Sequence, residues 1–127
     1  MKSNTKKHEV LKQCSIYAYM KNSNLPNGYK LVGVSSNKQT DFSADVIKNE
    51  NIIIIAFRGS DSIKDFYRSN KDMLLKNMPE QANDAINLYN RVKQEYPAAE
   101  IILTGHSLGG SLAQIVGALN DVETVKS

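Results

Sequence analysis

The chain has 127 residues, of which 41% are hydrophobic and 23% are charged, and its formal net charge is +3. This size allows one domain with its own core, and the composition is that of an ordinary globular protein. The single cysteine, Cys14, excludes an internal disulfide. The sequence has no basic stripe interleaved with aromatic residues, no apolar run of membrane-spanning length and no apolar leader, so we expect a cytoplasmic protein that neither binds nucleic acid nor spans a membrane.

The first part of the chain predicts one helix followed by a β-hairpin. Apolar residues recur at helical spacing over residues 6–21, where Cys14 is expected in the core. Residues 22–28 are rich in types that break regular structure. Residues 29–35 and 42–48 then predict two strands, the second with clear period-2 alternation. We expect a hairpin with one face exposed to solvent.

The middle of the chain predicts a buried strand followed by helices. Residues 51–57 contain four consecutive isoleucines, so both faces must be covered, as in a central parallel strand between helices. Ser62 and Asp65 form a possible capping box for a short helix from Ile63 to about Leu75. Pro79 suits the first turn of a further helix, which we expect to end at Tyr96-Pro97.

The last part of the chain predicts a second buried strand and a final helix. Residues 101–104 are reached by a helical crossover from the first buried strand, which makes the two strands parallel. The final helix is expected over about residues 107–120. Its predicted apolar face consists of Leu108, Leu112, Ile115, Val116 and Leu119. Because parallel strands place ligands beyond their carboxyl ends, the turns that follow both buried strands are expected to share one crevice.

The turn between the second buried strand and the final helix reads Gly105-His106-Ser107-Leu108-Gly109. The spacing Gly-x-Ser-x-Gly between a strand and a helix is that of a nucleophile elbow. Glycines two residues before and after the serine leave room for a strained turn and for close contact between strand and helix. This geometry exposes the serine hydroxyl and aims the first helical N–H groups at the same point.

Two separated motifs resemble the class 3 lipases of the α/β-hydrolase superfamily. The first is Ala56-Phe57-Arg58-Gly59-Ser60, followed by Ser62-Ile63-Lys64-Asp65-Phe66. The second runs from Ile101 through the elbow to Ala113, after Tyr96-Pro97. The resemblance covers residues 50–119 and implies a partial α/β-hydrolase fold with central parallel strands flanked by helices. Residues 1–49 carry no motif of the family, and the N-terminal antiparallel hairpin is predicted from the residue pattern alone.

The resemblance implies an enzyme that hydrolyses lipid or other acyl esters, such as acylglycerols, without a cofactor or a metal. Ser107 matches the family's nucleophile and Ser60 matches its oxyanion-hole residue. Leu108, directly after the nucleophile, would donate the second oxyanion N–H. Residues 62–75 fall where the family carries a lid or a helix close to the lid, and apolar residues there suit contact with an acyl chain, among them Ile63, Phe66 and Tyr67.

The chain departs from the family in the groups that handle protons. A serine hydroxyl needs a base within hydrogen-bond reach, oriented by a third group, and this superfamily supplies an aspartate and then a histidine downstream of the serine. Residues 108–127 contain no histidine, and Asp121 does not match the position of the family's acid. Of the two histidines, we interpret His106 as structural and His8 as a surface residue or a rewired base.

We therefore expect a single incomplete lipase-like domain over residues 1–127, the N-terminal portion of a longer ancestral hydrolase. One hypothesis is an enzyme whose acid and base come from a longer polypeptide or from a partner chain. The alternative is an inactive, truncated remnant that serves as a binding or interaction module. The strand at 101–103 would have an open outer edge unless residues 122–125 fold back, and an open edge favours a homo-oligomer or a complementing chain.

Overall fold

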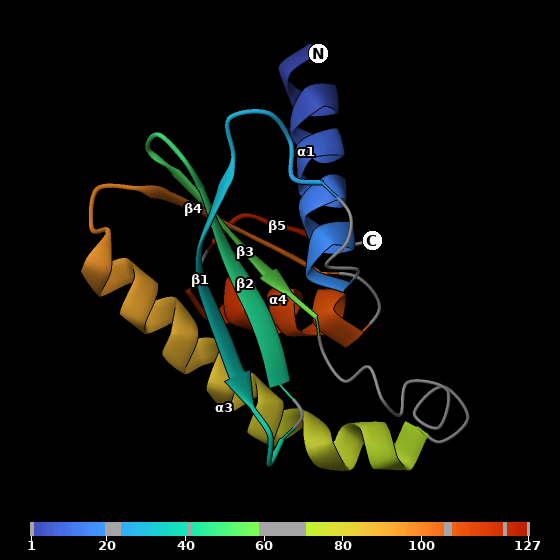
Figure 1. The fold of residues 1–127 in the computed structure, drawn as a ribbon. Coiled ribbons are helices and arrows are strands. Elements are labelled where there is room, and N and C mark those ends of the chain that lie inside the picture. Colours follow the sequence, from blue (N-terminus) through green and yellow to red (C-terminus); the bar gives the residue numbers. More distant parts are fainter. Residues whose placement is uncertain are drawn as a thin grey trace.

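The computed structural model describes residues 2–19, 24–40, 42–58, 71–105, 108–120 and 122–126. They form a five-stranded sheet with the strand order β1-β2-β3-β4-β5 and helices on both faces (Figure 1). The elements are α1 (Lys2–Tyr19), β1 (Lys30–Asn37), β2 (Phe42–Asn49), β3 (Ile52–Phe57), α3 (Lys71–Glu95), β4 (Glu100–Gly105), α4 (Leu108–Asn120) and β5 (Thr124–Lys126). The predicted architecture of parallel strands, flanking helices and an N-terminal hairpin is confirmed.

The β-hairpin forms as predicted, but its second strand is buried on both faces. β1 and β2 are antiparallel, with Asn37 opposite Phe42 at the turn. Phe42 and Ala44 belong to the core beneath α3 and α4, whereas Ile47 belongs to the core beneath α1. The prediction of one solvent-exposed face is therefore wrong for β2, because α1 covers the face that the alternation left open.

β3 is the central strand and separates two cores. Ile53, Ile55 and Phe57 face α3 and α4. Ile54 and Ala56 face α1, which contributes buried Leu11, Cys14 and Ala18. The isoleucine run is thus covered on both sides, as predicted, and Cys14 is a core residue. The predicted N-terminal helix is confirmed with an earlier start, and its predicted last two residues lie outside the described ranges.

α3 runs without interruption from Lys71 to Glu95, so the prediction that Pro79 begins a separate helix is wrong. An interior proline lacks an N–H and its ring presses on the preceding turn, which bends a helix without necessarily ending it. Figure 1 shows α3 changing direction between its lime-green start and its gold remainder. Of the predicted short helix, residues 63–70 lie outside the described ranges and residues 71–75 belong to α3. The helix ends before Tyr96-Pro97, as predicted.

α4 packs with its small residues closest to the sheet. Gly109, Ala113 and Gly117 recur every fourth residue and are all buried, and Leu112 and Val116 flank them. Leu119 is 66% exposed, so its predicted place on the buried face is wrong. The buried stripe is therefore centred on the small residues, with Leu112 and Val116 inside it and Leu119 outside it.

β5 covers the outer edge of the carboxyl half of β4. It is parallel to β4, with Leu103 opposite Thr124 and Gly105 opposite Lys126. Leu103 N donates a hydrogen bond of 3.0 Å to Glu123 O. The predicted alternative, in which the segment after α4 folds back, is confirmed. Across the described ranges, no helix is long and apolar enough to cross a membrane.

Candidate functional site

The two strands that carry the motifs end at the same level of the sheet. β3 and β4 are parallel, and Phe57, the last residue of β3, lies opposite Gly105, the last residue of β4. The segments that follow these residues therefore leave the same edge, from neighbouring strands about 4.8 Å apart. In open α/β sheets ligands bind beyond this carboxyl edge.

The first turn of α4 lies directly on the end of β3. A Cβ atom added to Gly109 would lie 1.9 Å from Phe57 O and 3.1 Å from the carbonyl carbon of Arg58. A Cβ atom added to Gly105 would lie 2.3 Å from the carbonyl carbon of Gly109 and 2.7 Å from Gly110 N. Real Cβ atoms essentially never approach closer than 3.0 Å, so only glycine fits at either position. Strand and helix are as tightly packed as an elbow requires.

The segment that leaves β3 starts in a defined direction. Arg58 N donates a hydrogen bond of 2.9 Å to Ser43 O on β2. The Phe57 ring packs against Phe42 with the centroids 6.1 Å apart and the planes tilted by 50°. The backbone at the start of the Arg58-Gly59-Ser60 motif is thereby fixed to the central strands.

Most of the predicted site residues lie outside the described ranges. These are Ser107, Ser60, Ile63, Phe66 and Tyr67. Leu108 is the first residue of α4. Their assigned roles stay predictions, and the scaffold that precedes and follows the two motifs is what the structure describes.

The amino end of α4 adjoins the carboxyl edge of the sheet. The helix has 13 residues, starting three residues after the end of β4. The first N–H groups of a helix have no intrahelical acceptor, and the helix dipole places about half a positive charge there. An oxyanion that develops beside this end would be stabilised by these groups.

His8 is an exposed residue at the opposite end of the sheet. Its neighbour Lys7 pairs through Nζ with Glu123 Oε2 at 2.6 Å and with Glu100 Oε1 at 3.9 Å. The hydrogen bond to Glu123 raises the pKa of Lys7. Glu100 begins β4, and at about 3.3 Å per residue the far end of this strand is about 17 Å away. His8 is therefore a surface residue, as predicted, and the rewired-base alternative is not supported by this placement.

A cavity of about 570 Å³ also lies at this amino end, between α1 and the sheet. Val10, Leu11 and Ile54 form part of its wall, and Lys7 and Glu100 line it as well. It is remote from the carboxyl edge and so is not the crevice predicted for the substrate. No cluster of three or more His, Cys, Asp or Glu side chains that would hold a metal is found in the described part of the chain.

A polar contact that sequence reasoning missed holds the hairpin turn to α3. The Asp84 carboxylate accepts hydrogen bonds from Thr40 Oγ1 at 2.5 Å and from Asn37 Nδ2 at 3.2 Å. Gln81 Nε2 donates to Thr40 O at 2.9 Å. β1 runs in the same direction as β3, so this turn lies at the same sheet edge as the candidate site. Polar residues are common both in turns and on helix surfaces, so the sequence carried no signal that the hairpin turn contacts Asp84.

Comparison with known families gives a direct assignment. The sequence profile of the Tle-like phospholipase domain, described as phospholipase-like, matches residues 13–124. The chain belongs to this family. The match includes the hairpin, both buried strands, α3 and α4, so the family relationship extends well beyond the two motifs.

Solved lipases share the fold. The lipase from Rhizopus microsporus var. chinensis superposes with a TM-score of 0.72, covering 99% of this chain and 57% of that one at 16% identity. The Rhizomucor miehei triacylglyceride lipase superposes with a TM-score of 0.70, covering 94% of this chain and 56% of that one at 19% identity. At these identities the likeness shows the fold, and it confirms the predicted portion of an α/β-hydrolase. The chain spans little more than half the length of these lipases.

Curated relatives match over a shorter stretch. The candidate lipase ATG15 of Vanderwaltozyma polyspora is 49% identical over 41 residues, which are 32% of this chain and 7% of that protein. The candidate lipase ATG15 of Penicillium rubens is 54% identical over 33 residues, which are 26% of this chain and 5% of that protein. The chain thus matches only a small part of these proteins. The predicted resemblance to lipases is confirmed by the family and by the fold.

Proposed function

We propose that this chain, as one domain, carries the nucleophile and the oxyanion hole of a serine hydrolase that cleaves acyl esters of lipids. Ser107 attacks the ester carbonyl, and Ser60 and the backbone N–H of Leu108 stabilise the resulting oxyanion. The family assignment favours phospholipids as the substrate class. Ile63, Phe66 and Tyr67 contact the acyl chain.

The contact between Gly109 and the end of β3 is the observation that carries this proposal. Phe57 and Gly105 are paired, and the amino turn of α4 presses on Phe57 O. Ser60 follows Phe57 by three residues and Ser107 follows Gly105 by two. Even a fully extended chain therefore places each serine no more than about 10 Å from the Phe57–Gly105 pair. Both serines are then within reach of one ester carbonyl.

The proposal takes the acid and the base from outside the 127 residues, either on a continuing polypeptide or on a partner chain. His8 lies at the wrong end of the sheet, and residues 108–127 contain no histidine. These two observations also favour the alternative function, a binding or interaction module that keeps the elbow for its structure. In that case Ser107 is not activated, because neither a continuing polypeptide nor a partner supplies a base.

Labelling with a fluorophosphonate probe separates the two functions. We expect the wild-type chain to be labelled when the acid and base are present, either on a polypeptide that continues past residue 127 or on an added partner chain, and Ser107→Ala to abolish the label. Ser111→Ala is the matched control, since Ser111 lies on α4 beyond the elbow and its loss should leave labelling unchanged. Absence of labelling in the folded chain under both conditions refutes the catalytic role and leaves the binding module.

A further inference from the structure

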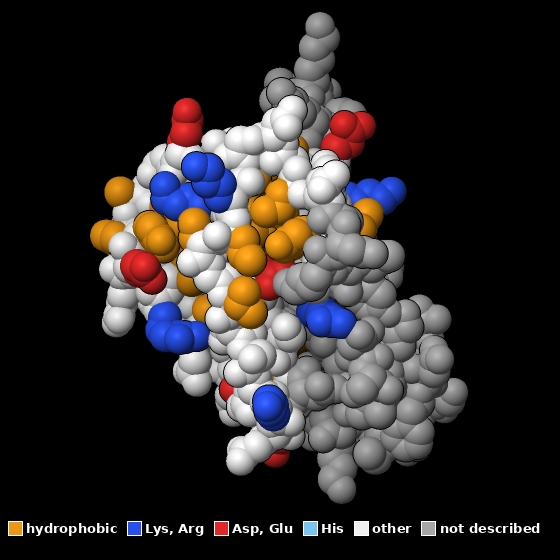
Figure 2. Space-filling view, in the orientation of Figure 1, with side chains coloured by type: hydrophobic (Ala, Val, Ile, Leu, Met, Phe, Trp, Pro, Cys, Tyr) orange, Lys and Arg blue, Asp and Glu red, His pale blue; other side chains and the backbone are white. Residues whose placement is uncertain are grey.

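β1 presents three aliphatic side chains to solvent at the edge of the sheet. Leu31, Val32 and Val34 are 39%, 44% and 60% exposed, and we call these three residues the β1 patch. Leu31 and Val34 are paired with Ile47 and Asp45 and so point to the α1 face, whereas Val32 lines a groove on the α3 face, so the β1 patch wraps around the open edge of the sheet. α1 packs mainly against β3 and β4, and does not cover β1. Figure 2 shows hydrophobic side chains gathered on this side of the molecule. Exposed aliphatic groups that form a patch are usual at surfaces that dock on a partner or on a membrane.

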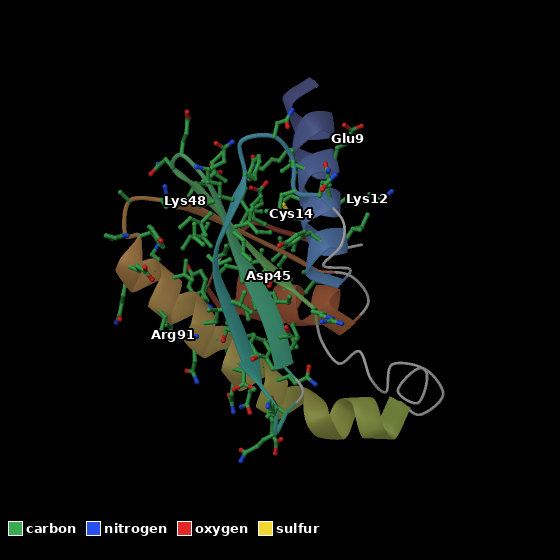
Figure 3. All side chains as sticks on the ribbon, in the orientation of Figure 1. Glu9, Lys12, Cys14, Asp45, Lys48 and Arg91 are labelled. Carbon is green, nitrogen blue, oxygen red and sulfur yellow. The ribbon has the colours of Figure 1, made fainter. Side chains whose placement is uncertain are left out.

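Basic side chains lie along the α3 side of the β1 patch and at the hairpin turn. They are Lys30, Lys38, Lys48 and Arg91, and Figure 3 labels Lys48 and Arg91 on this side of the molecule. Arg91 Nη2 donates a hydrogen bond of 3.1 Å to Ser35 Oγ, which holds the guanidinium beside β1. Glu95 shares with Arg91 a shallow groove next to Val32 and Val34. Cations therefore predominate around the patch.

Two of these cations face each other across the hairpin. Lys30 on β1 is directly opposite Lys48 on β2. Like charges in directly opposite positions of an antiparallel pair repel and destabilise it. The Lys48 ammonium donates a hydrogen bond of 2.6 Å to Glu50 O and lies 5.9 Å from the centroid of the Tyr96 ring, which fixes a positive charge at this end of the hairpin. An anionic partner would offset the two positive charges that the register brings together.

A second copy of the chain fits this surface poorly. Antiparallel pairing of two β1 strands centred on Val34 would place Lys30 of each copy opposite Lys38 of the other. The ladder irregularity between Leu31 and Gly33 also interrupts the edge that a second strand would need. Charge and edge geometry both favour an anionic surface over a copy of the same strand.

We propose that the β1 patch docks this chain on an anionic phospholipid surface. The aliphatic side chains enter between the headgroups, and the four basic side chains pair with phosphate groups. The proposal rests on the proposed function in one respect, namely that the substrate is presented by a lipid surface. Because β1 runs towards the sheet edge of the candidate site, docking through the hairpin brings this edge near the lipid.

Vesicle co-sedimentation in the Ser107→Ala background measures docking without turnover. We expect binding to vesicles of phosphatidylcholine with phosphatidylglycerol, weak binding to phosphatidylcholine alone, and a decline with added salt. Each of Lys30→Gln and Lys48→Gln should weaken binding about fivefold. Lys12→Gln, on an exposed position of α1 that Figure 3 labels away from β1, should not.

The apolar contribution has its own control pair. Val34→Ser should lower binding, whereas Leu119→Ser, which removes a side chain of similar exposure on α4, should leave it unchanged. Equal binding to both vesicle types, or unchanged binding by the β1 variants, overturns the proposal. A dimer in light scattering that Val34→Ser dissociates, without vesicle binding, assigns the surface to a second copy instead. Vesicle binding without fluorophosphonate labelling refutes the proposed chemistry alone, and labelling without vesicle binding refutes docking alone.

Discussion

Gly109 allows the packing of the candidate site to be tested without changing a reacting group. The substitution Gly109→Ala adds one methyl group 1.9 Å from Phe57 O and 2.6 Å from the carbonyl carbon of Phe57. Both are backbone atoms of the central strand, so they cannot rotate away as the end of a flexible side chain would. The methyl group therefore forces α4 and β3 apart.

The magnitude follows from this distance. To reach the 3.0 Å limit of real Cβ contacts, α4 has to retreat by about 1 Å. This movement loosens the contacts of Leu112, Ala113 and Val116, all of which are fully buried. Overpacking of this kind costs about 1–3 kcal/mol, and a clash with the backbone belongs at the upper end. Helix propensity acts in the opposite direction, because alanine is favoured over glycine by about 1 kcal/mol.

We therefore expect Gly109→Ala to lower the free energy of unfolding by about 2 kcal/mol and Tm by about 8 °C. Thermal and urea unfolding followed by far-UV circular dichroism measure this change. Gly33→Ala is the matched control, since its Cβ would lie 3.7 Å from Val46 Cβ, and its effect should stay within about 0.5 kcal/mol. A Gly109→Ala variant as stable as the wild type, or more stable, refutes the contact, because propensity alone predicts that sign.

Two further predictions concern the packing of α4 and of α1. In urea unfolding, Leu112→Ala should lower the free energy of unfolding by about 2–5 kcal/mol and Leu119→Ala by less than about 0.5 kcal/mol, because only Leu112 is fully buried. Similar losses in the two variants would contradict the orientation of α4. Burial raises the pKa of the Cys14 thiol from 9.0 to about 12, so iodoacetamide should label the thiol slowly in the folded chain and fast in urea. The folded state favours the protonated thiol, so its contribution to stability is complete below pH 9 and falls towards pH 12, a decline that should be smaller in Cys14→Ala. Equally fast labelling of folded and unfolded chain would show that the thiol is not buried.

Local patterns in the sequence determined the elements and the chemistry of the motifs. The isoleucine run of β3 predicted a strand covered on both faces, and the helical spacing around Cys14 predicted its burial. The Gly-x-Ser-x-Gly spacing of residues 105–109 predicted a strand, a tight turn and a helix, and the contacts of both glycines agree with it. These features depend on short-range geometry, which residues close in sequence decide between themselves.

Tertiary structure decided what covers each face. The polar alternation of β2 predicted an exposed face, yet α1 packs on Ile47 of that face, and both Asp45 and Ile47 are completely buried. Leu119 shares the periodicity of Leu112, but α4 turns its small residues to the sheet, with Gly109 against β3, and Leu119 is 66% exposed. Pro79 carries the usual signal for a helix start, and α3 passes through it.

The candidate site divides in the same way. The residue types of its two motifs were readable from the sequence, because a nucleophile and an oxyanion donor need particular side chains at particular spacings. The crossover also predicted that both motifs follow parallel strands, but the direct pairing of Phe57 with Gly105, 48 residues apart in the chain, was decided by the folded sheet. Sequence periodicity reports which residues share a face of a helix or strand, whereas only the folded chain determines which other element lies against that face.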